Sequence, residues 1–169
     1  IVLVADGIYN EDIDFNGKAI VVKSESGPAK TTISGTGVGD VVIGATDSTI
    51  QGFTITGSGN YGYACGVQAG TATMTITGNI ITGNYLGIRT SNYNEPLIVN
   101  NVIYNNLNYG ILASFYSSPI IINNTIAFNV NGISSYSGTG TVMNNIIVYN
   151  FRNGIYCTMP ESSPEISYN

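Results

Sequence analysis

The chain has 169 residues, and its composition excludes several classes of protein. Charged residues make up only 9% of it and the net charge is −5, so it lacks the basic surface that phosphate recognition needs, and we expect no nucleic-acid partner. Histidine is absent, which excludes imidazole catalysis and histidine metal sites in this chain, and no apolar run approaches the roughly 20 residues of a membrane span.

The first part of the chain, residues 1–57, contains short predicted strands separated by turns such as Asp6-Gly7. Within residues 12–15 the alternation of side chains directs Ile and Phe inward and sends Asp12 and Asp14 outward. These two carboxylates are candidate ligands for Ca²⁺, which prefers hard oxygen donors. The alternative is a solvated edge that discourages mispairing of strands, in which case the chain needs no cofactor.

A repeating unit first appears at residues 49–55, where Gly52 takes the place that asparagine occupies in later copies. The longer step from there to the next copy predicts that residues 58–63 bulge from the stack. The complete unit, Ile76-Thr77-Gly78-Asn79-Ile80-Ile81-Thr82-Gly83-Asn84, returns three times and is cut short in a fifth copy. The first asparagines of the copies are Asn79, Asn101, Asn124, Asn145 and Asn169. They lie about 22 residues apart, a period that predicts a solenoid in which each repeat is one rung.

Each repeat predicts three short strands, because a third apolar segment opens with Gly-Ile at residues 87, 110, 132 and 154. Stacking would place Ile76, Ile98, Ile121, Val142 and Ile166 in one core column and Ile81, Ile103, Ile126 and Ile147 in another. The asparagines would form a ladder whose amides bond from rung to rung and whose backbone tolerates left-handed turns. We therefore predict an all-β parallel β-helix, as a single domain over 1–169, less regular over 1–57 and regular over 66–169.

The asparagine and Gly-Ile repeats resemble those of right-handed parallel β-helix proteins related to pectate lyases. Residues 2–7, Val-Leu-Val-Ala-Asp-Gly, and residues 23–28 resemble the first rungs of secreted bacterial members. The resemblance covers nearly the whole chain and implies a right-handed coil and an extracellular or cell-surface location. It implies little about activity, because that family includes lyases, hydrolases, epimerases, tailspikes and proteins without known activity. The chain opens inside a predicted strand, so we expect a fragment or processed part of a longer protein.

Acid–base chemistry has few candidates, because Arg89, Glu95 and Arg152 are the charged residues between positions 66 and 158. Glu161 and Glu165 lie three rungs beyond Glu95, about 14 Å along the axis, which is farther than the roughly 5–10 Å between paired glycosidase carboxylates. A conventional hydrolase is therefore not expected.

A polysaccharide lyase is the runner-up hypothesis. In pectate lyases, a calcium-binding carboxylate cluster and an arginine or lysine act on an acidic polysaccharide, so the resemblance makes Arg89, with Tyr93 and Glu95 in the following loop, a candidate catalytic group. The carboxylate cluster is missing from this sequence. The alternative for Arg89 is a surface ion pair with Glu95.

Aromatic residues follow the Gly-Ile strand on three consecutive rungs, at Tyr93, Phe115, Tyr116 and Tyr136. A row of rings spaced by the rung repeat could stack against sugar faces, which predicts carbohydrate binding. The alternative is that the rings only cover the rungs beneath them.

A second surface feature is a set of apolar residues that alternation places outward, and contiguous exposed apolar patches usually mark an interface. These residues are Leu97, Val99, Val102, Tyr104, Ile120, Ile122, Ile146 and Val148. With few charges to keep copies apart, we expect packing against further copies, laterally or end to end.

The two cysteines, Cys65 and Cys157, fall four rungs apart, about 19 Å along the axis and too far for a disulfide. We predict that both are buried or half-buried, with Cys157 in the inward column of Thr90, Ala113 and Ser135. The leading functional prediction is a non-catalytic β-helix that is structural and assembly-forming or carbohydrate-binding, with a polysaccharide or further copies of itself as partner.

Overall fold

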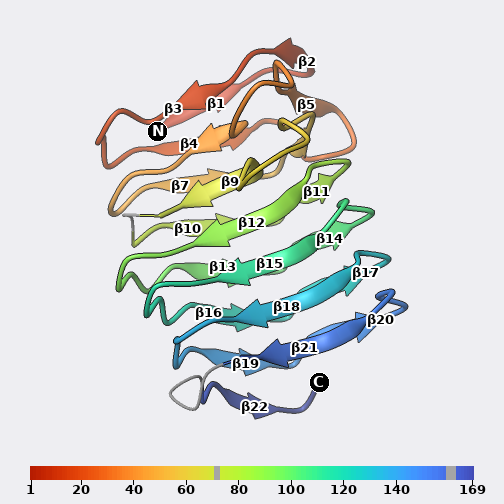
Figure 1. Cartoon of the computed structure of the whole chain (residues 1–169). Coiled ribbons are helices and arrows are strands. Elements are labelled where there is room, and N and C mark those ends of the chain that lie inside the picture. Colours follow the sequence, from red (N-terminus) through yellow and green to blue (C-terminus); the bar gives the residue numbers. More distant parts are fainter. Residues whose placement is uncertain (71–72, 159–162) are drawn as a thin grey trace.

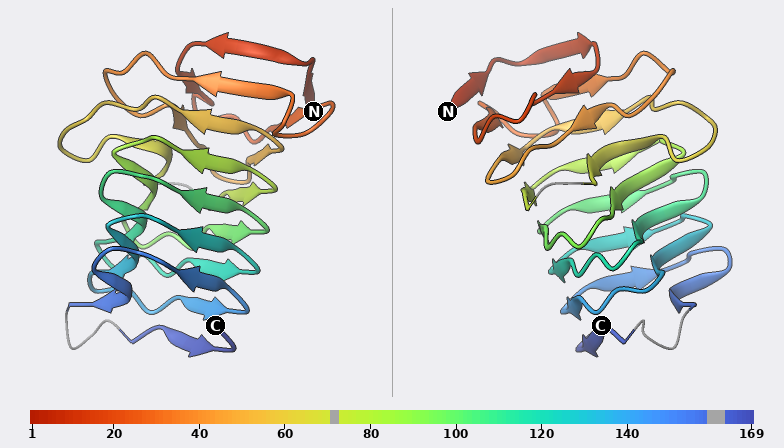
Figure 2. Two further views of the ribbon diagram at one scale, coloured as in Figure 1. Left: turned by 90° about the vertical axis from the view of Figure 1, so that its right-hand side faces the viewer. Right: turned by 60° about the vertical axis from the view of Figure 1, so that its left-hand side comes forward.

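The computed structural model describes residues 1–70, 73–158 and 163–169, which wind into a right-handed parallel β-helix (Figure 1). Successive rungs lie about 22 residues apart and stack along one axis (Figure 2). The predicted architecture is therefore confirmed, including three strands per rung. The described residues contain no helix, and hence none with the length and apolarity needed to cross a membrane.

The described strands form three parallel sheets, here called sheets A, B and C. Sheet A contains, in spatial order, β1 (Val2–Val4), β4 (Val21–Ser24), β7 (Thr49–Gln51), β10 (Thr75–Thr77), β13 (Leu97–Val99), β16 (Ile120–Ile122), β19 (Thr141–Met143) and β22 (Glu165–Ser167). Sheet B contains β2 (Gly7–Asn10), β5 (Thr31–Ser34), β8 (Thr54–Thr56), β11 (Ile80–Thr82), β14 (Val102–Tyr104), β17 (Thr125–Ala127) and β20 (Ile146–Val148). Sheet C contains β3 (Ile13–Asp14), β6 (Val42–Ile43), β9 (Cys65–Ala69), β12 (Leu86–Thr90), β15 (Tyr109–Ala113), β18 (Asn131–Ser135) and β21 (Asn153–Cys157).

The core consists of aliphatic side chains that stack on their own equivalents in neighbouring rungs. Sheet A aligns Ile50, Ile76, Ile98, Ile121, Val142 and Ile166, and sheet B aligns Ile81, Ile103, Ile126 and Ile147. Sheet C adds Val67, Ile88, Ile111, Ile133 and Ile155. These columns confirm the predicted ones, and the middle rungs are the most completely buried because each has a neighbour on both sides.

The asparagine ladder runs along the corner between sheets A and B. Asn101 shows the pattern: its backbone N–H donates to Asn124 Oδ1 at 2.9 Å, and its Nδ2 donates to the Ile76 carbonyl at 2.8 Å. The left-handed turn was predicted one residue too late, because the positive φ belongs to the residue before the ladder asparagine, such as Asn100 at 58°. The ladder side chain can therefore turn inward while its neighbour makes the bend. A second ladder of Asn84, Asn106, Asn129 and Asn150 lies between sheets B and C.

The register of the first copy differs from the prediction by one residue. Ile50 pairs with Ile76, so Phe53 and not Gly52 stands above Asn79, and the Phe53 N–H donates to Asn79 Oδ1 at 3.0 Å. Gly52 instead matches Gly78, and both glycines have positive φ, of 79° and 63°. Phenylalanine is buried here because this corner is filled by packing instead of by an amide.

Candidate binding groove

A groove of about 470 Å³ lies on the outer face of sheet C. Ile111 belongs to the core, so the alternation along β15 turns its neighbour Leu112 outward to form part of the groove lining. The lining residues are Tyr63, Tyr109, Leu112, Ser114, Phe115, Tyr116, Tyr136 and Ser137, and we call this site the tyrosine groove. It carries aromatic rings and hydroxyl groups, and none of these lining residues is charged.

Two tyrosines from different rungs are joined inside the groove. The hydroxyls of Tyr109, at the start of β15, and Tyr136, just after β18, lie 3.1 Å apart. The hydrogen bond with Tyr109, together with burial, raises the pKa of Tyr136 to about 12. The Tyr136 hydroxyl therefore keeps its proton at neutral pH. The Tyr136 N–H donates to the Ala113 carbonyl at 2.8 Å, which holds the backbone of Tyr136 beside the end of β15.

The loops beside the groove hold large aromatic residues in left-handed backbone conformations. Tyr93, Phe115 and Tyr116 have φ values of 59°, 50° and 61°, and all three side chains are exposed. A bulky residue at positive φ is an outlier that costs on the order of 1–3 kcal/mol. Interactions elsewhere in the structure must therefore hold these three residues in this backbone conformation. Tyr93 stacks on Tyr116 with ring centroids 5.1 Å apart and planes 9° from parallel. The predicted aromatic row thus contributes Phe115, Tyr116 and Tyr136 to the groove directly, and Tyr93 through its stack on Tyr116.

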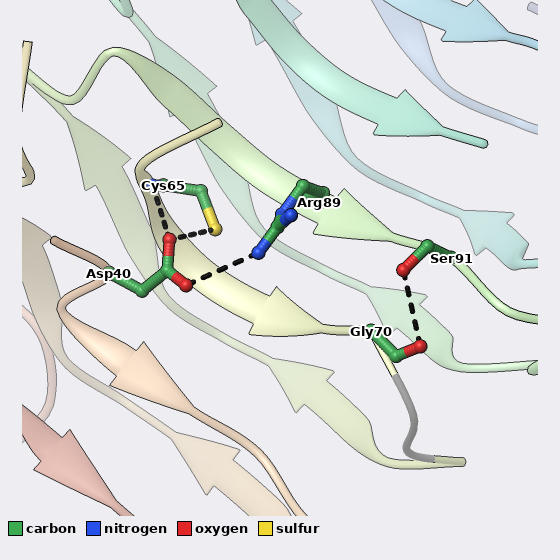
Figure 3. A network of polar contacts seen from close by, with 5 residues as sticks. All are labelled: Asp40, Cys65, Gly70, Arg89 and Ser91. Atoms are coloured by element: carbon green, nitrogen blue, oxygen red, sulfur yellow. Dashed lines mark hydrogen bonds and ion pairs between the residues drawn. The ribbon is translucent and has the colours of Figure 1, made fainter. Parts of the chain in front are cut away.

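Arg89 forms an ion pair with Asp40 (Figure 3). Arg89 Nη2 lies 3.3 Å from Asp40 Oδ2, and the two side chains are only 20% and 14% exposed. The guanidinium carbon also lies 5.9 Å from the ring centroid of Tyr63, which lines the groove. Asp40 Oδ1 accepts hydrogen bonds from the Cys65 N–H at 2.9 Å and from Cys65 Sγ at 3.1 Å. One carboxylate therefore holds an arginine and a buried cysteine together.

Cys65 is not an activated nucleophile. Burial raises the pKa of its thiol well above the usual range and the Asp40 charge raises it further, so the thiol stays protonated. Cys65 is buried as predicted and neither cysteine forms a disulfide, but Cys157 is exposed, contrary to expectation. It does occupy the predicted column, in register with Ser135. Its strand β21 is the last of sheet C among the described residues, which leaves this column without a covering strand on that side.

The predicted ion pair between Arg89 and Glu95 is wrong, because Arg89 pairs with Asp40 and the Glu95 side chain is exposed. Asp40 follows the irregular rung before β6, and it reaches Arg89 across two rungs of sheet C. Of the other candidate catalytic residues, Tyr93 is occupied in the stack with Tyr116. Glu161 lies outside the described residues.

The candidate metal ligands Asp12 and Asp14 point outward as predicted, and each is engaged by the chain itself. Asp12 accepts hydrogen bonds from the backbone N–H and the hydroxyl of Thr36, and Asp14 accepts one from the Asn16 N–H at 2.7 Å. Within the ranges the structure describes, no three histidine, cysteine, aspartate or glutamate residues are grouped to hold a metal ion.

The predicted apolar interface is divided between two faces. Leu97, Val99, Ile120 and Ile122 lie on sheet A, whereas Val102, Tyr104, Ile146 and Val148 lie on sheet B. Between them runs the A–B corner, where exposed Asn100, Asn123 and Asn144 make the left-handed turns. The most open of these apolar side chains is Ile146 at 58% exposure. A single continuous stripe was predicted because the strand alternation gives no information about the bend between the sheets.

Sequence reasoning missed several residues of this region, among them Asp40, Tyr63 and Tyr109. Tyr63 belongs to the irregular loop before β9, and Asp40 precedes β6 in another irregular part of the chain. Tyr109 directly precedes Gly110-Ile111, so the repeat itself could have placed it on the same face as Tyr136.

Comparison with known families gives one match: the model described as right handed beta helix region matches residues 10–169. Searches of curated proteins and of solved structures find no match.

Proposed function

The chain belongs to the right-handed β-helix family, and on that scaffold we propose that it is a non-catalytic, extracellular or cell-surface protein that binds carbohydrate in the tyrosine groove. The observation that carries the proposal is the composition of the groove lining, which combines tyrosine and phenylalanine rings with serine and tyrosine hydroxyls. Ligand pockets are mostly apolar with a few placed polar groups and occupy about 300–1,000 Å³, and the groove falls in that range. Ring faces suit the apolar faces of sugars, and hydroxyls suit their edges.

The left-handed aromatic residues support the same function. Phe115 and Tyr116 are exposed, so covering the core does not account for their unfavourable backbone. The left-handed backbone alone does not mark the groove, because Phe128 and Tyr149 share it elsewhere. Phe115 and Tyr116 differ in that their exposed rings also line the groove. We infer that these rings are held outward as a platform for a sugar ring.

Loss of one platform ring provides the test. Tyr116→Ala is expected to weaken oligosaccharide binding about tenfold, because an aromatic contact contributes its stacking in addition to the area it buries. Tyr149→Ala is the matched control: Tyr149 is also exposed, has φ of 54° and stacks on another ring, that of Phe128. It does not line the groove. Affinities would be measured by calorimetry with ligands chosen from a glycan array.

Two outcomes would contradict the proposal: no saccharide binds, or the two variants lose affinity equally. The non-catalytic part has its own test, because cleavage of a uronate polymer that is lost in Arg89→Ala would establish the lyase alternative. That alternative has less support, since Arg89 is paired with Asp40 and the groove is built around Leu112 and the tyrosines.

Self-assembly is a second candidate, favoured by the exposed apolar side chains of sheet B. Val102 and Ile146 are 39% and 58% exposed, and the adjoining corner adds exposed Phe128 and Tyr149. Thr125 lies between Val102 and Ile146 in this column, and Val148 is 39% exposed on the same face. In a two-fold symmetric contact, the same patch on a second copy would cover these side chains. The two functions use different faces and are compatible.

A further inference from the structure

The positive charge beside the tyrosine groove, that of Arg89, is neutralised within the protein by Asp40. The groove lining has no charged side chain, and Arg89, the cation that contacts Tyr63 of the lining, is already paired with Asp40. Both partners are largely buried, so salt and water screen their attraction less than they would on an open surface. The arginine also lies against the Tyr63 ring, which occupies part of its remaining surface.

We propose that the tyrosine groove selects uncharged saccharides, and that Asp40 determines this specificity by neutralising Arg89. The inference rests on the proposed function and names the substrate class of the same site. Without Asp40, the groove would have a free guanidinium at one end and would accept a uronate.

The position of Arg89 in sheet C makes it the residue that a sugar carboxylate would meet. Arg89 is in register with Leu112 of the groove lining, so their backbones are about one strand spacing, roughly 4.8 Å, apart. Both side chains point outward from the sheet, and Arg89 contacts Tyr63 at the groove wall. A ligand seated over Leu112 and Tyr63 is therefore beside Arg89. Figure 3 shows Arg89 held toward Asp40 in the ion pair.

An acidic sugar can gain little from Arg89 while Asp40 is present. To bind the guanidinium directly, its carboxylate would have to displace Asp40 and leave that carboxylate partly buried without its cation, which is unfavourable. If it bound beside the intact pair, it would lie near a second negative charge. Neither effect opposes the binding of an uncharged sugar. The ion pair therefore disfavours acidic sugars without itself attracting neutral ones.

Calorimetry with two oligosaccharide series tests the inference: neutral β-1,4-linked glucose or mannose oligomers, and oligogalacturonates of the same length. The wild-type protein is expected to prefer a neutral series by at least about tenfold. In Asp40→Asn, the amide oxygen can still accept the Cys65 N–H, while Arg89 loses its counter-charge. The preference is expected to shrink about tenfold, mainly through tighter uronate binding.

The control variant is Glu25→Gln, which removes the same charge from an exposed side chain on an early rung and should leave the preference unchanged. The double variant Asp40→Asn/Arg89→Gln removes both charges and should restore the preference for neutral sugars. If Asp40→Asn fails to fold, the wild-type comparison still tests the selectivity, and a double variant that binds oligogalacturonate as strongly as neutral sugars still contradicts the proposal.

The outcomes separate the two proposals. Stronger binding of oligogalacturonate by the wild-type protein overturns the selectivity and leaves carbohydrate binding intact. An equal loss of preference in Glu25→Gln also overturns it, because net charge and not Asp40 would then be responsible. If neither series nor any other saccharide binds, the proposed function fails and this inference fails with it.

Discussion

An inner ladder asparagine forms hydrogen bonds with residues of both neighbouring rungs, so it does more than allow a turn. Asn124 accepts hydrogen bonds from the Asn101 N–H at 2.9 Å and from Asn101 Nδ2 at 3.0 Å. Its own Nδ2 donates to the Ile98 carbonyl at 2.9 Å and to Asn145 Oδ1 at 3.0 Å. The side chain is almost completely buried, so water cannot replace these partners.

Replacing one ladder asparagine should therefore destabilise the protein strongly. Asn124→Ala is expected to lower the free energy of unfolding by at least about 3 kcal/mol, since each buried group left unsatisfied costs about 1–3 kcal/mol. Chemical denaturation monitored by circular dichroism measures the change. Asn60→Ala makes the same substitution on an exposed loop and should stay within about 0.5 kcal/mol of the wild-type protein. A similar small effect for Asn124→Ala would show that the ladder does not stabilise the stack.

The strands of sheet C begin at a point where neighbouring rungs approach too closely for a side chain. A Cβ on Gly110 would lie 2.7 Å from the Gly132 carbonyl oxygen and 2.9 Å from Asn129 Nδ2. The Gly-Ile motif thus reflects the contact between a strand and the second asparagine ladder. This is why glycine recurs on successive rungs at a position that has ordinary backbone angles.

Alanine substitution of a glycine in this column should destabilise the protein more on an inner rung than on the last one. Gly110→Ala is expected to destabilise the fold by about 1–3 kcal/mol, as overpacking in a tight core does. Gly154→Ala is the matched control, because a Cβ there would meet only Ile147 Cγ2 at an ordinary 3.5 Å. Thermal unfolding of the two variants provides the comparison. Equal losses would mean that the cost comes from strand propensity and not from the close approach.

The strands and core columns could be predicted because every regular rung buries its aliphatic side chains in the same way, and the sequence pattern therefore repeats from rung to rung. Where the repeat is irregular, the same reasoning failed: Gly52 was aligned one residue away from Phe53, since glycine in a turn resembles a missing asparagine. The groove was predicted only in part, because Tyr63 comes from a loop outside the repeat. The pairing of Arg89 with Asp40 depends on how that irregular rung lies over the regular ones, which the period does not specify.

At the scale of the whole molecule, the β-helix presents different chemistry on its faces. The outer face of sheet C bears the tyrosine groove, whereas sheet B and the adjoining corner bear exposed aliphatic and aromatic residues. The net charge of −5 gives little repulsion between copies relative to a chain with the usual share of charged residues. A contact through sheet B would leave the groove of each copy free.

Sedimentation velocity over a range of concentrations tests this arrangement. The wild-type protein is expected to form dimers or larger species as its concentration rises, because association removes Val102 and Ile146 from water. Val102→Thr/Ile146→Thr should shift the association to at least about tenfold higher concentration. Threonine fits these sites, since Thr54 and Thr125 occupy the same column in other rungs. Val38→Thr changes an exposed valine outside sheet B and should have no effect. Sheet B would be ruled out as the assembly face by a wild-type protein that stays monomeric throughout, or by equal shifts in Val102→Thr/Ile146→Thr and Val38→Thr. Saccharide binding in the groove, measured on the same samples, should be the same in these variants as in the wild-type protein.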